Sequence, residues 1–543
     1  MEKRWLSLYD ERLSENSEIL NRSLNDLLND SVEQFGDHTA ITFFRNTWRY
    51  NELKQMSEAM AGALSEEGFQ KGDRLAIMLP NCPQYLFSLF GTWRVGGAVV
   101  QVNPMYVDRE LKDILNDSEA THIVILSDLY PLFKKVRQDV PTKKAIVVEL
   151  KGNSKLELEN EDMFYHDFLQ TMKQSVPVVE INPAEDLAVL QYTGGTTGIS
   201  KGVMLTHLNF IANIEQMYEF MFKILPERPV NAKVINVLPL FHIFSMTVCN
   251  LLTIRHGGNQ IMIPRFDMPD VLEIIKHEQP FQFAGVPTMY VGFNQVGKYE
   301  TYGLNQIQNY ISGGSSLPVE ALETFEKGTG RPLCEGYGLS EAAPVTHFNP
   351  SFRERKAGSI GIPLPSTDAK VVRETDEGIE EVAVGEVGEL IIKGPQVMRG
   401  YWRKPEETRN TLRDGWLFTG DLARMDDEGY FYIVDRKKDL IIASGYNIYP
   451  REIEEVIYQH EGVQEVIVIG IPDEYRGETV KAYITKKETA HFSEKDIIDF
   501  CRKGLAAYKV PSAIEIRDQL PKSAVGKLLK RTLRNQELER LNP

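Results

Sequence analysis

Residues 187–202 read LAVLQYTGGTTGISKG, an apolar run followed by a loop of glycine, threonine and lysine. The apolar run is typical of a buried strand, and a helical pattern begins near Thr206. Similar short runs of Val, Ile and Leu, bounded by Gly, Pro or Asp, predict further buried strands at residues 74–79, 121–126 and 233–238. Apolar residues spaced three and four apart predict helices at residues 51–67 and 108–117. This alternation predicts an α/β fold, with sheets covered by helices.

The character of the chain changes near Asp435, where the charged cluster DRKKD precedes LIIAS, REIEEVIYQH and VQEVIVIGI. These segments predict a strand, a helix and a second strand, which together form a new small α+β unit. Residues 385–393 upstream are typical of a more exposed strand. We therefore predict an N-terminal domain at residues 1–435, a hinge at 436–438 and a small, mobile C-terminal domain at 439–543.

Composition narrows the classes of partner. The 543 residues carry a formal charge of −16, which argues against nucleic acid as a partner, so any cleft for an anionic ligand must gather its own lysines and arginines. The four cysteines form no CxxC pair, which favours a reducing cytoplasm over a disulfide framework or a structural zinc site. No signal-peptide pattern and no run of 18 apolar residues is present, so we expect no integral membrane segment. Peripheral membrane contact and homo-oligomerisation stay open.

The loop after the first quoted strand has the composition of a phosphate-binding loop. Glycines permit close backbone approach, threonine hydroxyls donate hydrogen bonds, and lysine supplies an ammonium group. The groups concerned are Thr193, Gly194, Gly195, Thr196, Thr197, Gly198, Lys201 and Gly202. The common GxxxxGK[ST] pattern is absent, because Ile199 and Ser200 separate the last loop glycine from Lys201. A flexible turn is the plain alternative for GGTTG alone, but the adjoining lysine and the order of strand, loop and helix favour a triphosphate.

This loop resembles the first signature of the adenylate-forming superfamily, which contains acyl-CoA synthetases, peptide-synthetase adenylation domains and firefly luciferase. The other signatures follow in family order as LPLFHIF (238–244), SGGSSLP (312–318), EGYGLSE (335–341), GWLFTGDLA (415–423), DRKKDLIIASGYNIYPREIE (435–454) and LPKSAVGKLLKR (520–531). The resemblance covers residues 25–531, and the closest overall likeness is to bacterial medium- and long-chain fatty acid-CoA ligases. It implies ATP, Mg²⁺ and coenzyme A as cofactors and co-substrates.

The resemblance also implies roles for the nucleotide-binding residues. Tyr337 would stack on adenine, Ser340 would contact the α-phosphate, and Glu341 would bind Mg²⁺ through its carboxylate. The remaining residues of this expected set are Gly313 and Gly314 as the adenine wall, with Glu335 and Gly336 from the same motif as Tyr337. Without the motif, a lone tyrosine would usually be core and a lone glutamate usually solvated surface.

Four more residues receive roles from the matching motifs. Asp421 would accept hydrogen bonds from the ribose hydroxyls with help from Arg436, although an isolated aspartate after glycine is more often a turn residue or helix cap. Lys527 would stabilise the charge that develops between the α-phosphate and the attacking carboxylate. His242 would position that carboxylate or gate the acyl pocket, whereas alone it would more often be a core histidine.

The family likeness further implies that the small domain rotates between two half-reactions. Rotation about Lys438 would withdraw Lys527 after adenylation and present Ser444, Gly445 and Tyr446 beside a tunnel for pantetheine. Gly445 would let this narrow arm pass. The predicted catalytic residues are thus Lys527, Glu341 and His242, and the predicted function is an AMP-forming fatty acid-CoA ligase.

Several alternatives remain at this stage. An enzyme that loads an amino acid or acyl group onto a carrier protein is the nearest, but residues 238–246 contain no Asp or Glu to pair with a substrate ammonium. A fatty acyl-AMP ligase is disfavoured because no long insertion separates Glu341 from Asp421. A luciferase-like oxygenase is not distinguished by these motifs. A catalytically inactive nucleotide-binding scaffold is disfavoured because Lys201, Glu341, Asp421 and Lys527 are all retained. Acyl chain length is not readable from the motifs.

Overall fold

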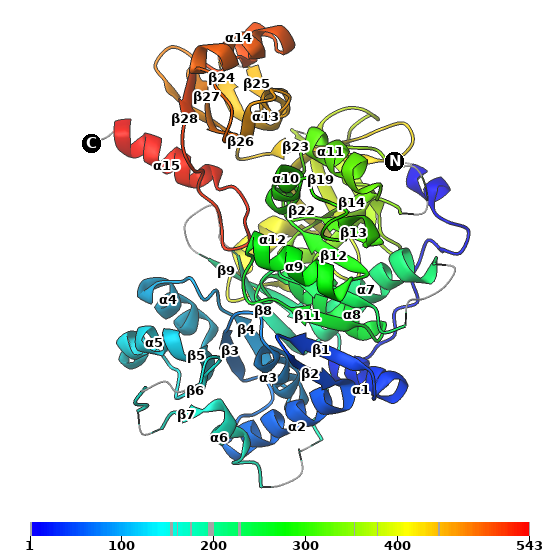
Figure 1. Cartoon of the computed structure of the whole chain (residues 1–543), viewed down its shortest axis with the longest axis vertical. Helices are drawn as coiled ribbons and strands as arrows, with labels where there is room; N and C mark the ends of the chain where they lie inside the picture. The colour runs from blue at the N-terminus through cyan, green and yellow to red at the C-terminus, as the bar shows by residue number, and fades with distance from the viewer. Residues whose placement is uncertain are drawn as a thin grey trace.

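Figure 1 shows the sheet of the C-terminal part at the top of the view, apart from the larger body that contains the other strands. The computed structural model describes residues 3–152, 156–159, 161–173, 176, 178–193, 200–225, 230–351, 353, 355–376, 378–443 and 446–541. Within these ranges the strands form four sheets. The predicted α/β class is confirmed, with a large N-terminal part and a small C-terminal α+β part.

The first sheet is mostly parallel and supplies several strand ends to the candidate site. In spatial order it contains β16 (Ile362–Pro363), β15 (Val345–Phe348), β14 (Leu333–Gly338), β13 (Asn309–Ser312), β12 (Gln282–Gly285), β10 (Lys233–Asn236), β11 (Asn259–Met262), β1 (Thr39–Phe43) and β2 (Asn46–Arg49). The strands from β14 through β1 pair in parallel. Their carboxyl ends therefore meet at one edge, where ligands bind in open α/β sheets.

The second sheet carries the glycine- and threonine-rich loop. It contains β20 (Gly400–Tyr401), β9 (Lys201–Thr206), β8 (Leu187–Thr193), β4 (Ala98–Gln101), β3 (Arg74–Met78), β5 (His122–Leu126), β6 (Lys144–Val148) and β7 (Met163–Phe164). The strands predicted from residues 74, 121, 187 and 233 are thus present. The expected order of strand, loop and helix was wrong in one respect, since β9 pairs antiparallel with β8 before the helix begins. Lys201 consequently starts a strand rather than preceding a helix directly.

The third sheet is antiparallel and carries the TGD motif. It contains β18 (Gly378–Glu381), β17 (Asp368–Thr375), β19 (Gly388–Lys393), β22 (Trp416–Met425) and β21 (Leu412–Arg413), with β23 (Phe431–Arg436) paired to β22. The strand expected at residues 385–393 is present as β19, but the prediction that it is exposed was wrong, because its central residues are buried. Its neighbours β17 and β22 cover both edges, and Leu390 and Ile392 enter the main core.

The fourth sheet belongs wholly to the C-terminal part of the chain. It contains β25 (Tyr446–Ile448), β24 (Ile441–Ala443), β27 (Gly477–Lys486) and β26 (Val463–Asp473), with β28 (Ala513–Ile516) paired to β27. Its buried residues form a core of their own, centred on Ile453, Val468 and Ile484. A separate core is what an independently moving domain requires. The turn between β23 and β24 contains the predicted hinge, whose limits stay a prediction.

The helices cover the sheets. They are α1 (Leu24–Phe35), α2 (Tyr50–Glu66), α3 (Pro83–Arg94), α4 (Asp108–Ser118), α5 (Tyr130–Val136), α6 (Tyr165–Leu169), α7 (His207–Tyr218), α8 (Leu252–Arg255), α9 (Met268–Glu278), α10 (Pro287–Val296), α11 (Val319–Thr329), α12 (Pro405–Thr411), α13 (Pro450–Tyr458), α14 (Glu494–Gly504) and α15 (Lys530–Leu541). Local sequence sets their ends; Thr206, for example, caps α7 by accepting a hydrogen bond from the backbone N–H of Asn209. Among the described helices, none has the length and apolar character needed to cross a membrane.

Two segments of the described chain are π-helical, and the second contributes Val248 to the wall of the candidate site. They are Glu219–Lys223, which continues α7, and Ser245–Leu251, which leads into α8. π-helical turns are rare and frequently occur at functional sites. The second segment begins three residues after His242, so the irregular backbone lies beside a predicted site residue.

The N-terminal segment lies along the third sheet. Trp5 is buried, and its ring meets the ring of Phe431 on β23 edge to face with centroids 5.8 Å apart. Lys3 forms ion pairs of 2.6 Å with Glu15 and 2.5 Å with Asp368 on β17. The first residues of the chain are therefore packed against strands formed by residues far along the sequence.

Candidate functional site

One large cavity of about 1290 Å³ collects most of the residues predicted from the motifs. Its walls include strand ends of the first three sheets and, from the C-terminal part, residues of α13, β26 and the segment 525–535. The described predicted residues that line it are Thr193, Lys201, His242, Gly313, Gly314, Glu335, Gly336, Tyr337, Ser340, Glu341, Asp421, Arg436, Lys438 and Lys527. Residues separated by hundreds of positions in sequence are thus brought to one space.

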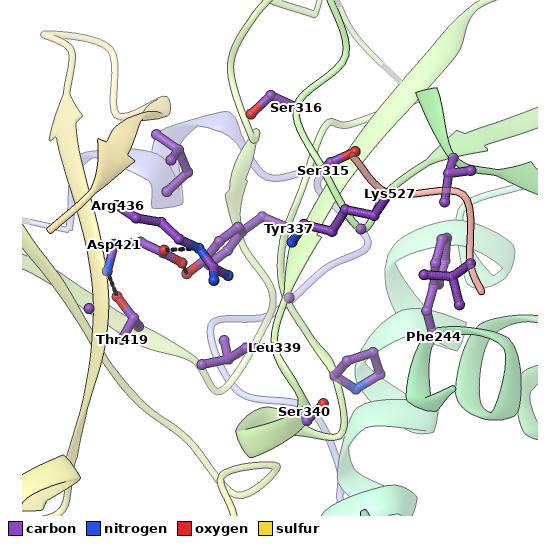
Figure 2. Close-up of a pocket in the computed structure, with 18 of the residues that line it drawn as sticks. Phe244, Ser315, Ser316, Tyr337, Leu339, Ser340, Thr419, Asp421, Arg436 and Lys527 are labelled. Atoms are coloured by element: carbon purple, nitrogen blue, oxygen red, sulfur yellow. Dashed lines mark hydrogen bonds and ion pairs between the residues drawn. The ribbon is translucent and has the colours of Figure 1, made fainter. Parts of the chain in front are cut away.

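Asp421 organises the polar end of the cavity. It lies on β22 and is only 6% exposed. Its carboxylate accepts a hydrogen bond of 2.6 Å from the Tyr337 hydroxyl and pairs with Arg436 Nε at 3.2 Å, as Figure 2 shows. Burial, and then the charge of Asp421, raises the pKa of Tyr337 well above its usual value, so this hydroxyl stays a donor. Asp421 is therefore a fixed acceptor, as ribose binding requires.

Glu341 lies just after the end of β14 and has a partner that the sequence did not reveal. The Tyr401 hydroxyl donates a hydrogen bond of 2.8 Å to Glu341 Oε1. The ammonium of Lys201 lies 5.1 Å from the centre of the same Tyr401 ring, within the range of a cation–π contact. Tyr401 thus links the predicted metal carboxylate to the predicted phosphate lysine. The only sequence signal for it was an aromatic residue in RGYW (399–402), outside the motifs used.

The two wall glycines lie where a side chain would not fit freely. A Cβ atom on Gly313 would come within 3.1 Å of the Phe244 ring, and Gly314 has a φ of +83°, which side chains rarely adopt. Figure 2 shows Phe244 on the side of the pocket where the Lys527 loop passes. The two glycines directly follow the end of β13, and their backbone without side chains is consistent with close approach of a flat ligand. The stacking of adenine on Tyr337 stays a prediction.

His242 lines the same cavity, whose walls also include apolar side chains. Burial, and secondarily the positive charge of Lys527, lowers the pKa of His242 to about 4, so the imidazole is neutral at pH 7. Its Nδ1 accepts a hydrogen bond of 3.3 Å from the backbone N–H of Phe244. Neighbouring lining residues are Met217, Leu238, Ile243, Val248, Val345 and Phe348. A neutral imidazole in this cavity can donate a hydrogen bond to a substrate carboxylate without carrying a charge of its own.

Lys527 enters this cavity from the C-terminal part of the chain. Figure 2 shows its side chain extending from the loop into the pocket, toward Tyr337. Burial, and then the positive charge of Arg436, lowers the pKa of Lys527 to about 8. The ammonium is therefore the main form at neutral pH but is poised near the deprotonation range, as is common for functional lysines.

Glu335 is the predicted residue whose surroundings differ most from those of a ligand-binding carboxylate. It is 6% exposed, and burial raises its pKa to about 7. Its Oε1 accepts a 3.3 Å hydrogen bond from the backbone N–H of Leu317, and within the described residues Oε2 has no hydrogen-bond partner. Contact of Glu335 with a nucleotide stays a prediction.

Several predicted residues lie outside the described ranges. They are Gly194, Gly195, Thr196, Thr197 and Gly198 of the phosphate loop and Ser444 and Gly445 of the proposed pantetheine passage. The two ends of the phosphate loop are described, since Thr193 pairs with Lys201 across the β8–β9 ladder. Both residues line the cavity, so the loop begins and ends at its edge.

The described residues fit a magnesium ion that is held mainly by a substrate. Among them, no three His, Cys, Asp or Glu side chains gather as a metal-binding group. Magnesium commonly uses one or two carboxylates together with phosphate oxygens and water. The Glu341 carboxylate on the cavity wall matches this pattern, with one oxygen engaged by Tyr401.

Comparison with protein-family models gives two matches. Residues 28–402 match the model described as AMP-binding enzyme, and residues 452–527 match the AMP-binding enzyme C-terminal domain. A curated relative from Bacillus subtilis (strain 168), named long-chain-fatty-acid–CoA ligase, is 44% identical over 557 residues, which cover 99% of both chains.

Solved structures agree in fold. MatB from Rhodopseudomonas palustris with ATP bound has a TM-score of 0.84 at 30% identity, covering 95% of this chain and 99% of that chain. The apo structure of MatB, with the same coverage and identity, has a TM-score of 0.75. The overall arrangement of this chain is therefore more similar to that of ATP-bound MatB.

Proposed function

The chain belongs to the AMP-binding enzyme family, and we propose that its cavity joins a long-chain fatty acid to coenzyme A at the expense of ATP. It is an AMP-forming acid–thiol ligase whose small-molecule substrates are a fatty acid, ATP and CoA. Chain length is the finer part of the proposal; it is supported by the name of the Bacillus subtilis relative and by the apolar lining beside His242.

The reaction proceeds in two balanced steps. A carboxylate oxygen of the fatty acid attacks the α-phosphorus of ATP, and the bond to the β-phosphate oxygen breaks, so acyl-AMP forms and pyrophosphate leaves. The thiol of CoA then loses its proton and attacks the acyl carbon, and AMP leaves as the thioester forms. Each step places different groups beside the acyl carbon, which a mobile domain can supply in turn.

The arrangement of this chain's residues supports specific roles in the first step. Asp421 would hold the ribose, Lys527 would stabilise charge on the α-phosphate, and His242 would orient the fatty acid carboxylate. Magnesium, when bound with ATP, supplies positive charge for the phosphates, and Glu341 would hold it. The observation that carries the proposal is that one cavity is lined both by these polar residues and by apolar side chains such as Met217, Val248 and Phe348.

The function is tested by following both half-reactions with a series of acids from C2 to C18. We expect exchange of pyrophosphate into ATP that depends on the fatty acid, and CoA thioester formation that is best with long chains. Exchange with amino acids, or transfer only to a carrier protein, would favour the carrier-loading alternative. Absence of exchange with every acid would favour the inactive scaffold.

Replacing Glu341 by glutamine tests the proposed metal carboxylate. The variant keeps the side-chain size and an oxygen that can accept from Tyr401, but it removes the negative charge. We expect turnover to fall and the Mg²⁺ concentration for half-maximal adenylation to rise about tenfold, because a neutral ligand binds a hard cation more weakly. Initial rates over a magnesium titration at saturating ATP measure this. Replacing Tyr401 by phenylalanine removes only the hydrogen bond to Glu341 and should have a smaller effect. An unchanged magnesium titration in the glutamine variant would contradict the role of Glu341 as a magnesium ligand.

The pH dependence of adenylation tests the state of Lys527. Its lowered pKa of about 8 means that the ammonium is present below pH 8 and is lost above it. The kcat/KM of adenylation for ATP should therefore fall as pH rises through about 8, while kcat should fall at higher pH because bound phosphates stabilise the ammonium. Replacement of Lys527 by arginine, which stays charged, should remove this decline from whatever activity remains. A decline identical in the arginine variant would assign it to another group.

Three further points belong to the proposal. The limits of the hinge at residues 436–438 are supported by the separate core of the C-terminal sheet. Passage of pantetheine beside Ser444 and Gly445 is supported by the family resemblance alone. A cytoplasmic location is supported by four cysteines that are all buried and free of disulfides.

A further inference from the structure

The loop that carries Lys527 is a compact hydrogen-bonded unit. The backbone N–H of Ser523 donates to the carbonyl of Lys527 at 2.8 Å, and the N–H of Lys527 donates back to the Ser523 hydroxyl oxygen at 3.1 Å. The N–H of Gly526 also donates to the carbonyl of Ser523 at 2.9 Å. The loop can therefore be positioned as a single body, because its internal geometry is fixed by its own bonds.

The large domain provides a seat for this loop at the start of α10. Thr288 is the second residue of that helix, and its hydroxyl donates to the carbonyl oxygen of Gly526 at 3.3 Å. The residue that accepts this bond directly precedes Lys527. A position one residue from the ammonium-bearing side chain is where a small shift of backbone would matter most to the reacting atoms.

Packing at the same point shows that the contact is close. A Cβ atom on Gly526 would come within 3.1 Å of the Thr288 hydroxyl oxygen and 3.3 Å of a Val286 methyl group. Gly526 also has a φ of +79°, in the region that favours glycine. The bare backbone of Gly526 thus rests directly on the turn between β12 and α10, and a larger residue would lift the loop from it.

A second set of contacts is located near the hinge and not at the loop. Arg534 on α15 donates to the carbonyl of Lys438 at 3.2 Å, and the backbone N–H of Arg451 donates to Asp435 at 2.9 Å. Such contacts lie close to the expected pivot and change little in length for a given rotation. The Thr288 contact instead joins the large domain to the loop that carries Lys527 itself, so it must break whenever that loop leaves the cavity.

We propose that Thr288 is a positioning residue, whose hydroxyl docks the Lys527 loop on the large domain for adenylation and releases it for thioester formation. The proposal rests on the proposed ligase function. A single hydrogen bond between uncharged groups contributes modestly to stability, so it can bias the docked arrangement and still break in every cycle. The partner is a segment of this same chain, and no additional ligand is needed.

Replacing Thr288 by valine tests the proposal, because valine keeps the shape and removes the donor. Adenylation, measured by pyrophosphate exchange, should fall about fivefold, the loss expected for one hydrogen bond of this kind. Consumption of purified acyl-AMP by CoA should be unchanged or faster. Replacing Thr288 by serine, which keeps the hydroxyl, should restore most of the exchange rate. Equal loss in both half-reactions, or no loss in either, would overturn the proposal.

A double-mutant cycle shows whether Thr288 acts through Lys527. In a chain that already carries Lys527→Ala, the further change Thr288→Val should leave the residual exchange rate unaltered, since there is no ammonium left to position. An additional fivefold loss in that background would mean that Thr288 acts on substrate directly. The pH profile gives an independent readout: in Thr288→Val the decline near pH 8 should shift to higher pH as the loop becomes more exposed.

Failure of this proposal is distinguishable from failure of the proposed function. If the unmodified protein shows no exchange with any fatty acid, the ligase function falls, and the docking role of Thr288, which rests on it, falls as well. If the unmodified protein is active and the valine and serine variants behave alike, the function stands and the docking role of Thr288 falls. Melting curves of each variant verify folding, and the serine variant covers the case in which valine destabilises the helix start.

Discussion

Replacement of Lys527 by alanine should slow adenylation at least about a hundredfold, the loss typical when a preorganised charge at a reacting centre is removed. Lys527 projects into the cavity from the C-terminal loop, and its pKa of about 8 leaves it mainly charged at neutral pH. Conversion of purified acyl-AMP and CoA to the thioester should be nearly unaffected, because attack on the α-phosphorus occurs only in the first step and the proposed domain rotation withdraws Lys527 before the second. Single-turnover measurements of each half-reaction test this separation.

A neighbouring lysine provides the matched control. Lys530 lies three residues on and also lines the cavity, but its ammonium is paired with Glu454 of the C-terminal domain at 2.9 Å. The change Lys530→Ala should lower thermal stability without separating the two half-reactions. Equal loss of both half-reactions in Lys527→Ala would contradict the assignment of Lys527 to adenylation.

Replacement of Asp421 by alanine should reduce kcat/KM for ATP by about thirtyfold or more, since hydrogen bonds to a charged group contribute about 1.5–3 kcal/mol each. The carboxylate is buried and is held by Tyr337 at 2.6 Å and Arg436 at 3.2 Å. Its removal would leave a buried hydroxyl and a guanidinium without their acceptor, and the ribose without its partner. The KM for the fatty acid should change little, because Asp421 lies at the polar end.

The Tyr337→Phe variant separates the parts of this effect. It removes one donor to Asp421 and keeps the aromatic face, so we expect a loss of only a few-fold in kcat/KM for ATP. A melting curve of each variant excludes general unfolding. An unchanged KM for ATP in Asp421→Ala would show that the carboxylate serves the sheet rather than the nucleotide.

The signature motifs allowed much of the polar end of the site to be predicted from sequence. Each motif lies at a strand end or in a turn, where few residue types can both adopt the required backbone conformation and contact a ligand. The amino acids of the motif therefore identify the site by themselves. Asp421, Arg436 and Lys527 were found in this way, and all three line one cavity. The strands near residues 74, 121, 187 and 233 were also predictable, because buried parallel strands read as apolar runs.

Other features depend on contacts between segments that are distant in the sequence, and the local sequence does not reveal these contacts. β9 was missed because its six residues follow a loop directly and owe their conformation to the ladder with β8. The burial of β19 was misjudged because two neighbouring strands, formed elsewhere in the chain, cover it. Tyr401 was missed for the same reason, since its contact with Glu341 spans 60 residues. The apolar lining of the cavity comes from α7, a π-helical segment and β15. The preferred length of the acyl chain could therefore not be predicted from any one segment of the sequence.

The position of the N-terminal segment has a consequence for how the chain is made. Trp5 leaves the ribosome long before the ring that it packs against, since Phe431 is synthesised more than four hundred residues later. Strand β1 likewise cannot form its parallel pairing with β11 until β11 has been synthesised. Contacts between such distant segments slow folding, because a long loop must close before they contribute any stability. The large domain should therefore mature late in synthesis, and its early segments would remain exposed to chaperones until β23 has emerged.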